Sequence, residues 1–225
     1  MNRQKIIIYP ILIFLLILTG CSSLMTGLYG IKSLNKIDDK TILSYAKKIG
    51  IPERDVYHLD YNYFSYLFSL DTTEYKAQIR NHSQPLQARY YDKSGELKSF
   101  HVNCHAGGFP NLKWNRNNVM STFLPGEQTP VDTIFPLERQ KKYLIPLPQT
   151  ELTDYADYDY IVIVFWNRFM GRQSKRLIRY VQDNSKLATD KRVKIIYVNN
   201  DNSFYRIMNN GSRQHGIANN SGAWW

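Results

Sequence analysis

The chain has 225 residues, a formal net charge of +10 and an apolar fraction of 43%. This length suffices for one domain with its own core, and the apolar fraction excludes a chain that is disordered by composition. The positive charge is compatible with an anionic lipid, a glycan or a nucleic acid as partner. No block of five like charges occurs, however, which favours an ordinary solvated surface.

The N-terminus has the features of an export signal. Arg3 and Lys5 precede an apolar run of 13 residues, from Ile6 to Leu18, which is shorter than the roughly 20 residues that span a bilayer. The run ends in Leu18-Thr19-Gly20-Cys21, which resembles the lipobox of bacterial lipoproteins. The alternative is an uncleaved anchor with an incidental cysteine.

The lipobox resemblance implies that residues 1–20 are a signal peptide and that Cys21 carries the lipid. Acyl chains on Cys21 would make the membrane a stable partner. Residues 21–37 would form the tether, and residues 38–225 a single domain. No acidic cluster adjoins Cys21, which favours the outer membrane and its periplasmic side. Export also makes nucleic acid a poor candidate as partner.

The domain begins with a predicted helix over Thr41–Ile49. Asp38 and Asp39 supply a capping side chain and a negative first turn, and Gly50 is a natural stop. A short strand is expected over Val56–Leu59.

Residues 61–104 are predicted to form two helices and a β-hairpin. Tyr61–Leu70 is apolar on every side and suits a strand or a buried helix, with the helix favoured. A second helix is expected over Glu74–Asn81, capped by Thr72 or Thr73. Leu86–Cys104 has the pattern of a β-hairpin, because a turn rich in Asp, Ser and Gly divides it.

A long irregular region follows the hairpin. Residues 106–136 contain several glycines and prolines together with the aromatic segment Phe109–Trp114, so a packed loop is expected. Pro136 opens a predicted short helix over Leu137–Leu144, and Pro146 and Pro148 are expected to close it.

The central stretch of the chain predicts strand, turn, helix and strand. Tyr160–Trp166 is continuously apolar, which is typical of a strand covered on both faces. Gly171 begins the helix, and Val193–Val198 is a second apolar strand, parallel to the first. Phe204–Met208 could form one more short element.

The segment VFWNRFMGRQSKRL resembles the active-site stretch of thioredoxin-like proteins, in which a strand ending in Phe-Trp leads to a Cys-Gly-Pro-Cys type motif at a helix start. Phe165 and Trp166 match the strand end, and Gly171 matches the motif glycine. Met170 and Gln173 stand at the two cysteine positions. Arg172 stands at the proline position. The alternative is a generic strand–helix–strand unit.

The resemblance implies a fold without its chemistry. Neither a thioether nor an amide can carry out thiol–disulfide exchange. The cis-proline that the family places on a later strand is also missing, since no proline follows Pro148. The helix start at Gly171, with Arg168 and Arg172 nearby, could still bind an anion or simply be solvated.

Cys104 and His105 are the residues on which an alternative, enzymatic reading depends. A Cys–His pair could form a nucleophile or contribute to a metal site. Strand alternation places Cys104 on the face of Phe100 and Val102, opposite His101, which favours a buried structural thiol. No sequence motif indicates a metal or a cofactor.

These observations predict an α/β domain with a thioredoxin-like, three-layer arrangement at about residues 130–201, preceded by an N-terminal α/β elaboration that contains the hairpin. The predicted function is a non-catalytic binding or structural module of the cell envelope, with a possible envelope protein as partner. Its expected contact surfaces are the Asn167–Gln173 loop and the Phe109–Trp114 loop. The alternative is a thiol-dependent enzyme that uses Cys104 with His105.

Overall fold

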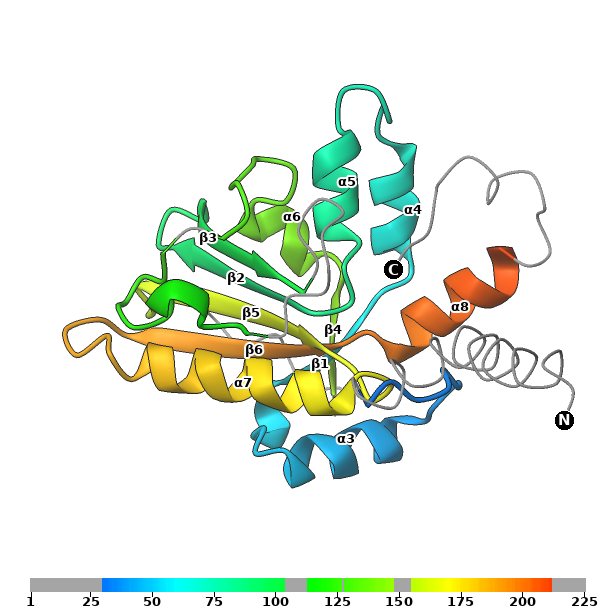
Figure 1. Cartoon of the computed structure of the whole chain (residues 1–225), viewed down its shortest axis with the longest axis horizontal. Coiled ribbons are helices and arrows are strands. Elements are labelled where there is room, and N and C mark those ends of the chain that lie inside the picture. The colour runs from blue at the N-terminus through cyan, green and yellow to red at the C-terminus, as the bar shows by residue number, and fades with distance from the viewer. Residues whose placement is uncertain (1–29, 104–112, 127, 148–154, 212–225) are drawn as a thin grey trace, which may run out of the picture.

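The computed structural model describes residues 30–103, 113–126, 128–147 and 155–211 (Figure 1). Its described strands form one six-stranded mixed sheet in the order β3-β2-β5-β6-β1-β4. The strands are β1 (Val56–Leu59), β2 (Gln87–Asp92), β3 (Leu97–Val102), β4 (Leu144–Leu147), β5 (Tyr160–Trp166) and β6 (Val193–Asn199). β5, β6 and β1 are parallel, whereas β2, β3 and β4 each run antiparallel to a neighbour.

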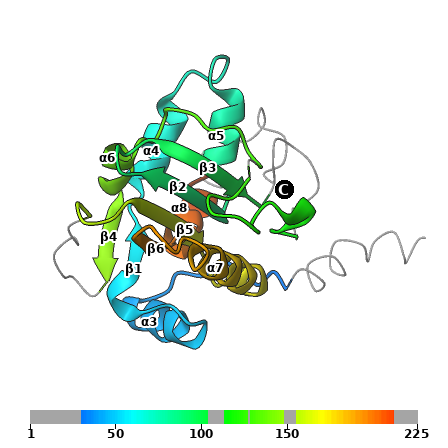
Figure 2. The same ribbon diagram turned by 90° about the vertical axis from the view of Figure 1, so that its left-hand side faces the viewer.

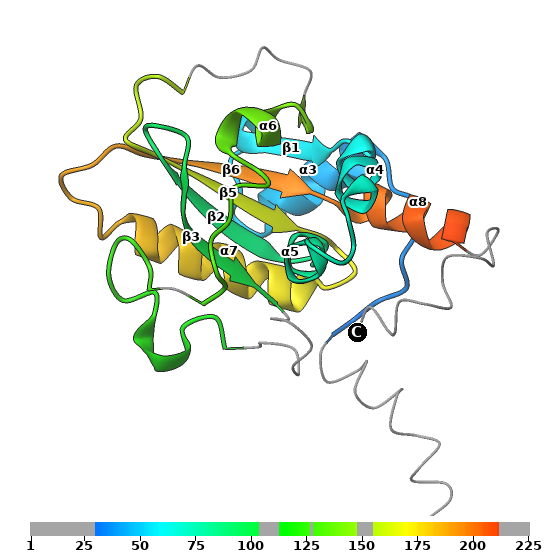
Figure 3. The same cartoon turned by 90° about the horizontal axis from the view of Figure 1, so that it is seen from above.

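Helices cover both faces of the sheet. The α-helices are α3 (Asp39–Lys48), α4 (Asn62–Ser69), α5 (Lys76–His82), α6 (Leu137–Lys141), α7 (Gly171–Ser185) and α8 (Asp201–Gly211). α3 and α7 lie on one face, and α4, α5 and α6 lie on the other, as Figure 2 also shows. α8 continues from β6 past the end of the sheet (Figure 3). The α/β class predicted from the sequence is therefore confirmed.

The apolar run of β5 is explained by its central place in the sheet. Val162, Val164 and Trp166 point into the core beneath α3 and α7. Ile161, Ile163 and Phe165 alternate with them and pack into the core on the other face. Both sides of the strand are buried, so every position in it favours an apolar side chain.

The predicted helix after residue 40 is confirmed as α3. The Asp38 carboxylate accepts a hydrogen bond from the Thr41 N–H at 2.8 Å and caps the helix. Ile42 and Ala46 are buried, and Gly50 follows the helix with a φ of +83°. The strand over Val56–Leu59 is also confirmed.

The other predicted elements are present, with three corrections. α5 has no side-chain cap, so the prediction for Thr72 and Thr73 is wrong; instead the Asp71 carboxylate accepts hydrogen bonds from the N–H groups of Thr73 and Glu74. The helix expected over 137–144 ends at Lys141. Leu144–Leu147 form β4, a strand that was not predicted. Finally, β1 and the β2–β3 hairpin belong to the same sheet as β5 and β6, and are not an appended elaboration.

The two outermost strands of the sheet differ from its interior. Beside β3, the Thr129 N–H donates to the Phe100 carbonyl at 3.1 Å, and the Val102 N–H donates to the Gln128 side chain at 3.1 Å. β4, on the opposite edge, contains Pro146, which has no N–H. In the part of the chain that the structure describes, no helix is long and apolar enough to cross a membrane.

Candidate functional site

The carboxyl ends of the three parallel strands meet at one edge of the sheet. β5 ends at Trp166, β6 at Asn199 and β1 at Leu59. Ligands of open α/β sheets bind at this kind of edge, in the crevice beyond the strand ends. The side chains that follow these strands are therefore the first candidates for a site.

Asp201 organises the turn that follows β5. Its carboxylate accepts hydrogen bonds from the Arg168 N–H at 2.8 Å and the Phe169 N–H at 3.3 Å, and from the Asn199 amide at 2.8 Å. Burial raises the pKa of Asp201, although these donors oppose the shift. The carboxylate thus joins the end of β6 to the turn between β5 and α7.

Asn167 fixes the same turn from the other side. Its amide donates to the Pro85 carbonyl and to the Asn200 side chain, both at 3.1 Å, and its oxygen accepts from the Met170 N–H at 2.8 Å. The Ser174 hydroxyl donates to the Asn167 carbonyl at 2.7 Å. The turn is therefore held by hydrogen bonds within itself and by hydrogen bonds to Pro85 and Asn200.

The predicted site residues in this turn are mostly covered. Met170 is 4% exposed and Gln173 is 2% exposed. A Cβ added to Gly171 would lie 2.3 Å from the Tyr45 hydroxyl, so α3 packs directly on the start of α7. Arg168 is half-buried and Arg172 is exposed, so these two side chains are the accessible part of the predicted surface.

The segment before α3 adds to this cover. The Lys32 N–H donates to the Phe169 carbonyl at 2.7 Å. Tyr45 stacks on Trp166 with a centroid distance of 6.1 Å, and the Arg168 guanidinium lies 5.7 Å from the centre of the Tyr45 ring. The start of α7 is thereby shielded by protein, which disfavours the anion site considered from the sequence.

The predicted residues Cys21, Cys104 and His105 lie outside the described residues, as does most of the Phe109–Trp114 loop. Trp114 itself is buried. The strand that leads to Cys104 is described. In it His101 is buried, with its Nε2 3.1 Å from the Ser99 hydroxyl, and burial lowers the pKa of His101 to about 4. Among the described residues no cluster of acidic, histidine or cysteine side chains could hold a metal ion.

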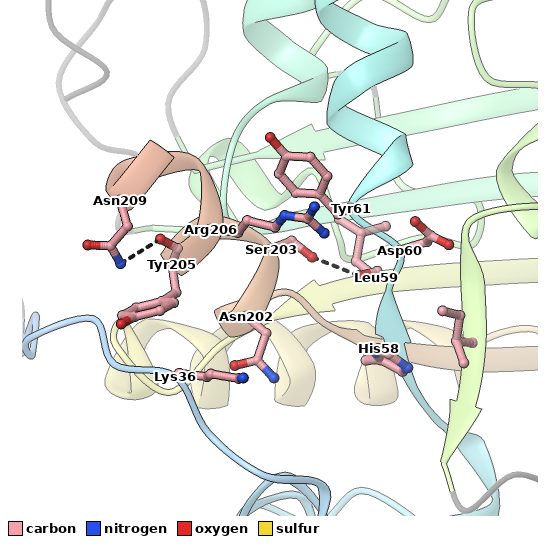
Figure 4. Close-up of a pocket in the computed structure, with 11 residues that line it drawn as sticks. Lys36, His58, Leu59, Asp60, Tyr61, Asn202, Ser203, Tyr205, Arg206 and Asn209 are labelled. Carbon is pink, nitrogen blue, oxygen red and sulfur yellow. Dashed lines mark hydrogen bonds between the residues drawn. The ribbon is translucent and has the colours of Figure 1, made fainter. Parts of the chain in front are cut away.

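A groove opens beside the carboxyl ends of β1 and β6, with a volume of about 540 Å³ (Figure 4). We call it the β1–α8 groove. It is lined mainly by Lys36, His58, Tyr61, Asn202, Tyr205 and Arg206. These residues come from the segment before α3, the end of β1 and the first turns of α8, so no single stretch of sequence contains them.

The walls of the groove are fixed by hydrogen bonds. The Asn202 side chain exchanges two with the backbone of Ile37, at 2.9 and 2.8 Å. The Ser203 hydroxyl donates to the Leu59 carbonyl at 2.7 Å (Figure 4). Asn202 and Ser203 therefore join α8 to the segment before α3 and to the end of β1. Ligand binding in the groove would depend on its other polar side chains.

The charged groups of the groove are mostly cationic. The Arg206 guanidinium lies 3.9 Å from the centre of the Tyr61 ring, which orients it across the mouth of the groove (Figure 4). Lys36 lines the opposite side. Asp60 is the acidic residue of the lining, and its carboxylate already accepts from the Asn62 N–H at 2.7 Å. Burial lowers the pKa of His58, so that this ring is neutral at pH 7.

No family model, curated protein or solved structure matches this chain. The site must therefore be interpreted from its geometry. That geometry offers a groove of mixed polar and apolar lining, with two cationic side chains, one carboxylate and a neutral imidazole.

A second polar cluster, which was not predicted from the sequence, lies between the sheet and the layer of α4, α5 and α6. Arg89 of β2 is completely buried. Its Nε and Nη2 donate to the Gln87 side-chain oxygen, at 3.0 and 2.6 Å. Nη2 also donates to the Tyr63 hydroxyl at 2.6 Å, and Nη1 donates to the Gln140 side-chain oxygen. Its Cζ lies 4.7 Å from the centre of the Phe165 ring. Arg89 thus has neutral partners in this cluster.

The acidic side chain nearest to this cluster is Asp132, and His82 lies between it and Arg89. The Asp132 carboxylate oxygens lie 2.9 and 3.0 Å from His82 Nε2. Burial and the charge of Arg89 lower the pKa of His82 to about 4, against the opposing effect of Asp132. Burial alone would raise the pKa of Asp132, but the hydrogen bond from His82 keeps it below its usual value. His82 is therefore a neutral donor to an ionised Asp132 at pH 7.

Proposed function

We propose that this protein is a lipoprotein of the cell envelope, anchored through Cys21 in the outer membrane and facing the periplasm, whose domain binds a ligand without catalysing a reaction. The signal-like N-terminus and the lipobox resemblance support the anchor. The observation that carries the binding role is the β1–α8 groove, because it is a preformed polar cavity at the edge of the sheet where α/β domains bind ligands.

We further propose that the β5–α7–β6 unit is a redox-inactive version of the thioredoxin-like unit. The chain places a strand end at Trp166, a tight turn and a helix start at Gly171, as the resemblance implies. The positions of the two redox cysteines are occupied by Met170 and Gln173, and both side chains are buried. A redox reaction at this turn would need thiols that these residues do not have.

The ligand of the groove should carry an anionic group, such as a carboxylate or a phosphate. Arg206 and Lys36 provide two cationic donors, and ion-assisted hydrogen bonds are the stronger ones that proteins form. An envelope protein partner could supply this group through an acidic side chain, and a small molecule could supply it directly.

Binding of a simple phosphate ester tests the groove. We expect glycerol 3-phosphate to shift the backbone amide resonances of Asn202 and Arg206 in two-dimensional NMR spectra, and glycerol to leave them unchanged. Arg206→Ala should weaken the phosphate ester about tenfold, the equivalent of roughly 1.4 kcal/mol. Arg192→Ala, which removes an exposed arginine outside the groove, is the matched control. Identical spectra with and without the phosphate ester would contradict the proposed ligand class.

Thiol titration tests the absence of thiol chemistry. In the lipidated chain Cys104 is the only remaining thiol, since the sequence contains two cysteines. We expect a disulfide reagent at pH 7 to modify Cys104 at least roughly a hundredfold more slowly in the folded protein than in denaturant, as for a buried, inert cysteine. Rapid modification of the folded protein would instead favour the enzyme that uses Cys104 with His105. Two reactive thiols per denatured chain would contradict the lipidation of Cys21.

A further inference from the structure

The positive charge of the described residues is concentrated on one face of the molecule. Residues 30–48 and 171–186 contain ten Lys and Arg and three Asp. The remaining described residues contain sixteen Lys and Arg and thirteen Asp and Glu. These two segments are far apart in the sequence but form one layer, because α3 and α7 both cover the same face of the sheet (Figures 1 and 2).

The basic side chains in these segments all point away from the core. On α7 the residues Leu177, Ile178 and Val181 pack against the sheet. The opposite side of the helix carries five exposed cationic residues, Arg172, Lys175, Arg176, Arg179 and, just past its end, Lys186. This spacing of three or four residues places them in one stripe.

α3 continues this surface. Lys40, Lys47 and Lys48 are exposed, whereas Ile42 and Ala46 face the sheet. The two helices are neighbours, since the Gln182 amide of α7 donates to the carbonyl of Gly50, two residues after α3, at 3.0 Å. We call the exposed Lys and Arg of residues 32–48 and 172–186 the basic face.

Two apolar side chains lie within this cationic surface. Tyr180, which follows Arg179 on α7, is 39% exposed. Leu187, just after α7, is 48% exposed. Aromatic and aliphatic side chains among cationic ones are typical of segments that rest at a membrane–water interface. Asp183 is the acidic residue of α7, and it already pairs with Lys186 at 2.8 Å.

The tether joins the domain at the same face. A Cβ added to Gly30, the first described residue, would lie 3.3 Å from the side chain of Arg172. Gly30 lies nine positions after the cysteine of the lipobox, and even a fully extended chain covers only about 30 Å over nine steps. A lipid on Cys21 would therefore keep the basic face within a short distance of the bilayer surface.

We propose that the basic face docks on an anionic phospholipid leaflet, so that the lipid anchor and the domain bind the same membrane. This inference rests on the proposed lipidation of Cys21. Anionic headgroups attract cationic residues that lie within a Debye length, about 10 Å at moderate ionic strength. The orientation leaves the α4–α5–α6 layer directed away from the membrane (Figure 2).

Lysine acylation in vesicles tests this orientation. The lipidated full-length chain is reconstituted in phosphatidylethanolamine–phosphatidylcholine vesicles with or without phosphatidylglycerol, treated with a water-soluble acylating reagent and mapped by mass spectrometry. We expect Lys47, Lys48 and Lys175 to react several-fold more slowly only where phosphatidylglycerol is present. Lys76 on α5 should react equally in both. High salt should remove the protection.

Charge reversal provides the matched comparison. Arg176→Glu together with Arg179→Glu should abolish most of the protection, while Arg80→Glu together with Lys142→Glu, on the opposite layer, should preserve it. Equal acylation of the basic face in the two vesicle types would overturn the docking proposal, as would protection that survives the first variant. The anchor is judged separately by sedimentation: a chain that fails to sediment with either vesicle type refutes lipidation at Cys21.

Discussion

Arg89→Lys is expected to reduce the free energy of unfolding by at least about 3 kcal/mol, the range measured when a buried charge loses its partners. Lysine would keep the positive charge inside a ring of aromatic side chains. Its single ammonium group could not make both the paired hydrogen bonds to the Gln87 oxygen and the hydrogen bond to the Gln140 oxygen. The measurement is urea denaturation at pH 7, followed by circular dichroism.

Two comparisons identify the cause of this effect. Arg89→Met fills a similar volume without the charge, so we expect it to be less destabilising than Arg89→Lys. Arg176→Lys changes an exposed arginine in the same way and should alter stability by less than about 0.5 kcal/mol. A loss below about 1 kcal/mol for Arg89→Lys would mean that the guanidinium geometry is unimportant for the core.

The free energy of unfolding is also expected to fall as the pH drops from about 6.5 to 4. The upper limit is the pKa of a histidine in an unfolded chain, and the lower limit is the pKa of His82 and His101 in the folded protein. The pKa values of His82 and His101 are each lowered to about 4 in the folded protein. In this interval the unfolded chain binds protons that the folded protein does not, so stability rises with pH and is fully present above about 6.5. Each histidine should contribute roughly 3 kcal/mol.

Denaturation curves at a series of pH values, with single and double variants, measure this dependence. His82→Gln and His101→Gln should each reduce the change between pH 6.5 and 4, and the double variant should reduce it most. His58 will retain a smaller slope of the same sign, because burial also lowers its pKa. A wild-type curve that is flat over this interval would show that the two rings do not stay neutral in the folded protein.

The core strands and most helices could be predicted because their signals are local. The apolar run of Tyr160–Trp166 and the Asp38 cap of α3 each lie within one segment. β4 was missed because four residues around a proline have no readable period, and only its pairing with β1 makes them a strand. The burial of Arg89 was not predicted, because a charged residue in an alternating strand predicts an exposed face. Here Tyr63 of α4, Gln140 of α6 and Phe135 of the loop before α6 cover that face.

The candidate site was harder to predict than the fold. The strand end at Trp166 and the helix start at Gly171 were predicted correctly. The cover of the turn between them is not visible in the sequence, because Tyr45 and Lys32 lie more than 100 residues earlier. The β1–α8 groove combines Lys36, Tyr61 and Arg206, which become neighbours only when β1 and β6 pair. Likewise the ten lysines and arginines of residues 30–48 and 171–186 come from two distant segments and gather on one face only when α3 packs beside α7.

The proposed anchoring through Cys21 gives the edges of the sheet a further consequence, because it would confine the domain to a membrane surface. Molecules that diffuse in two dimensions with a common orientation meet often, and an unpaired strand edge would let one sheet extend into the next. Here the segment at Gln128 and Thr129 occupies backbone groups of β3, and Pro146 interrupts the donors of β4. Both edges therefore resist strand addition, so a dense layer of these molecules can stay free of sheet-driven aggregation.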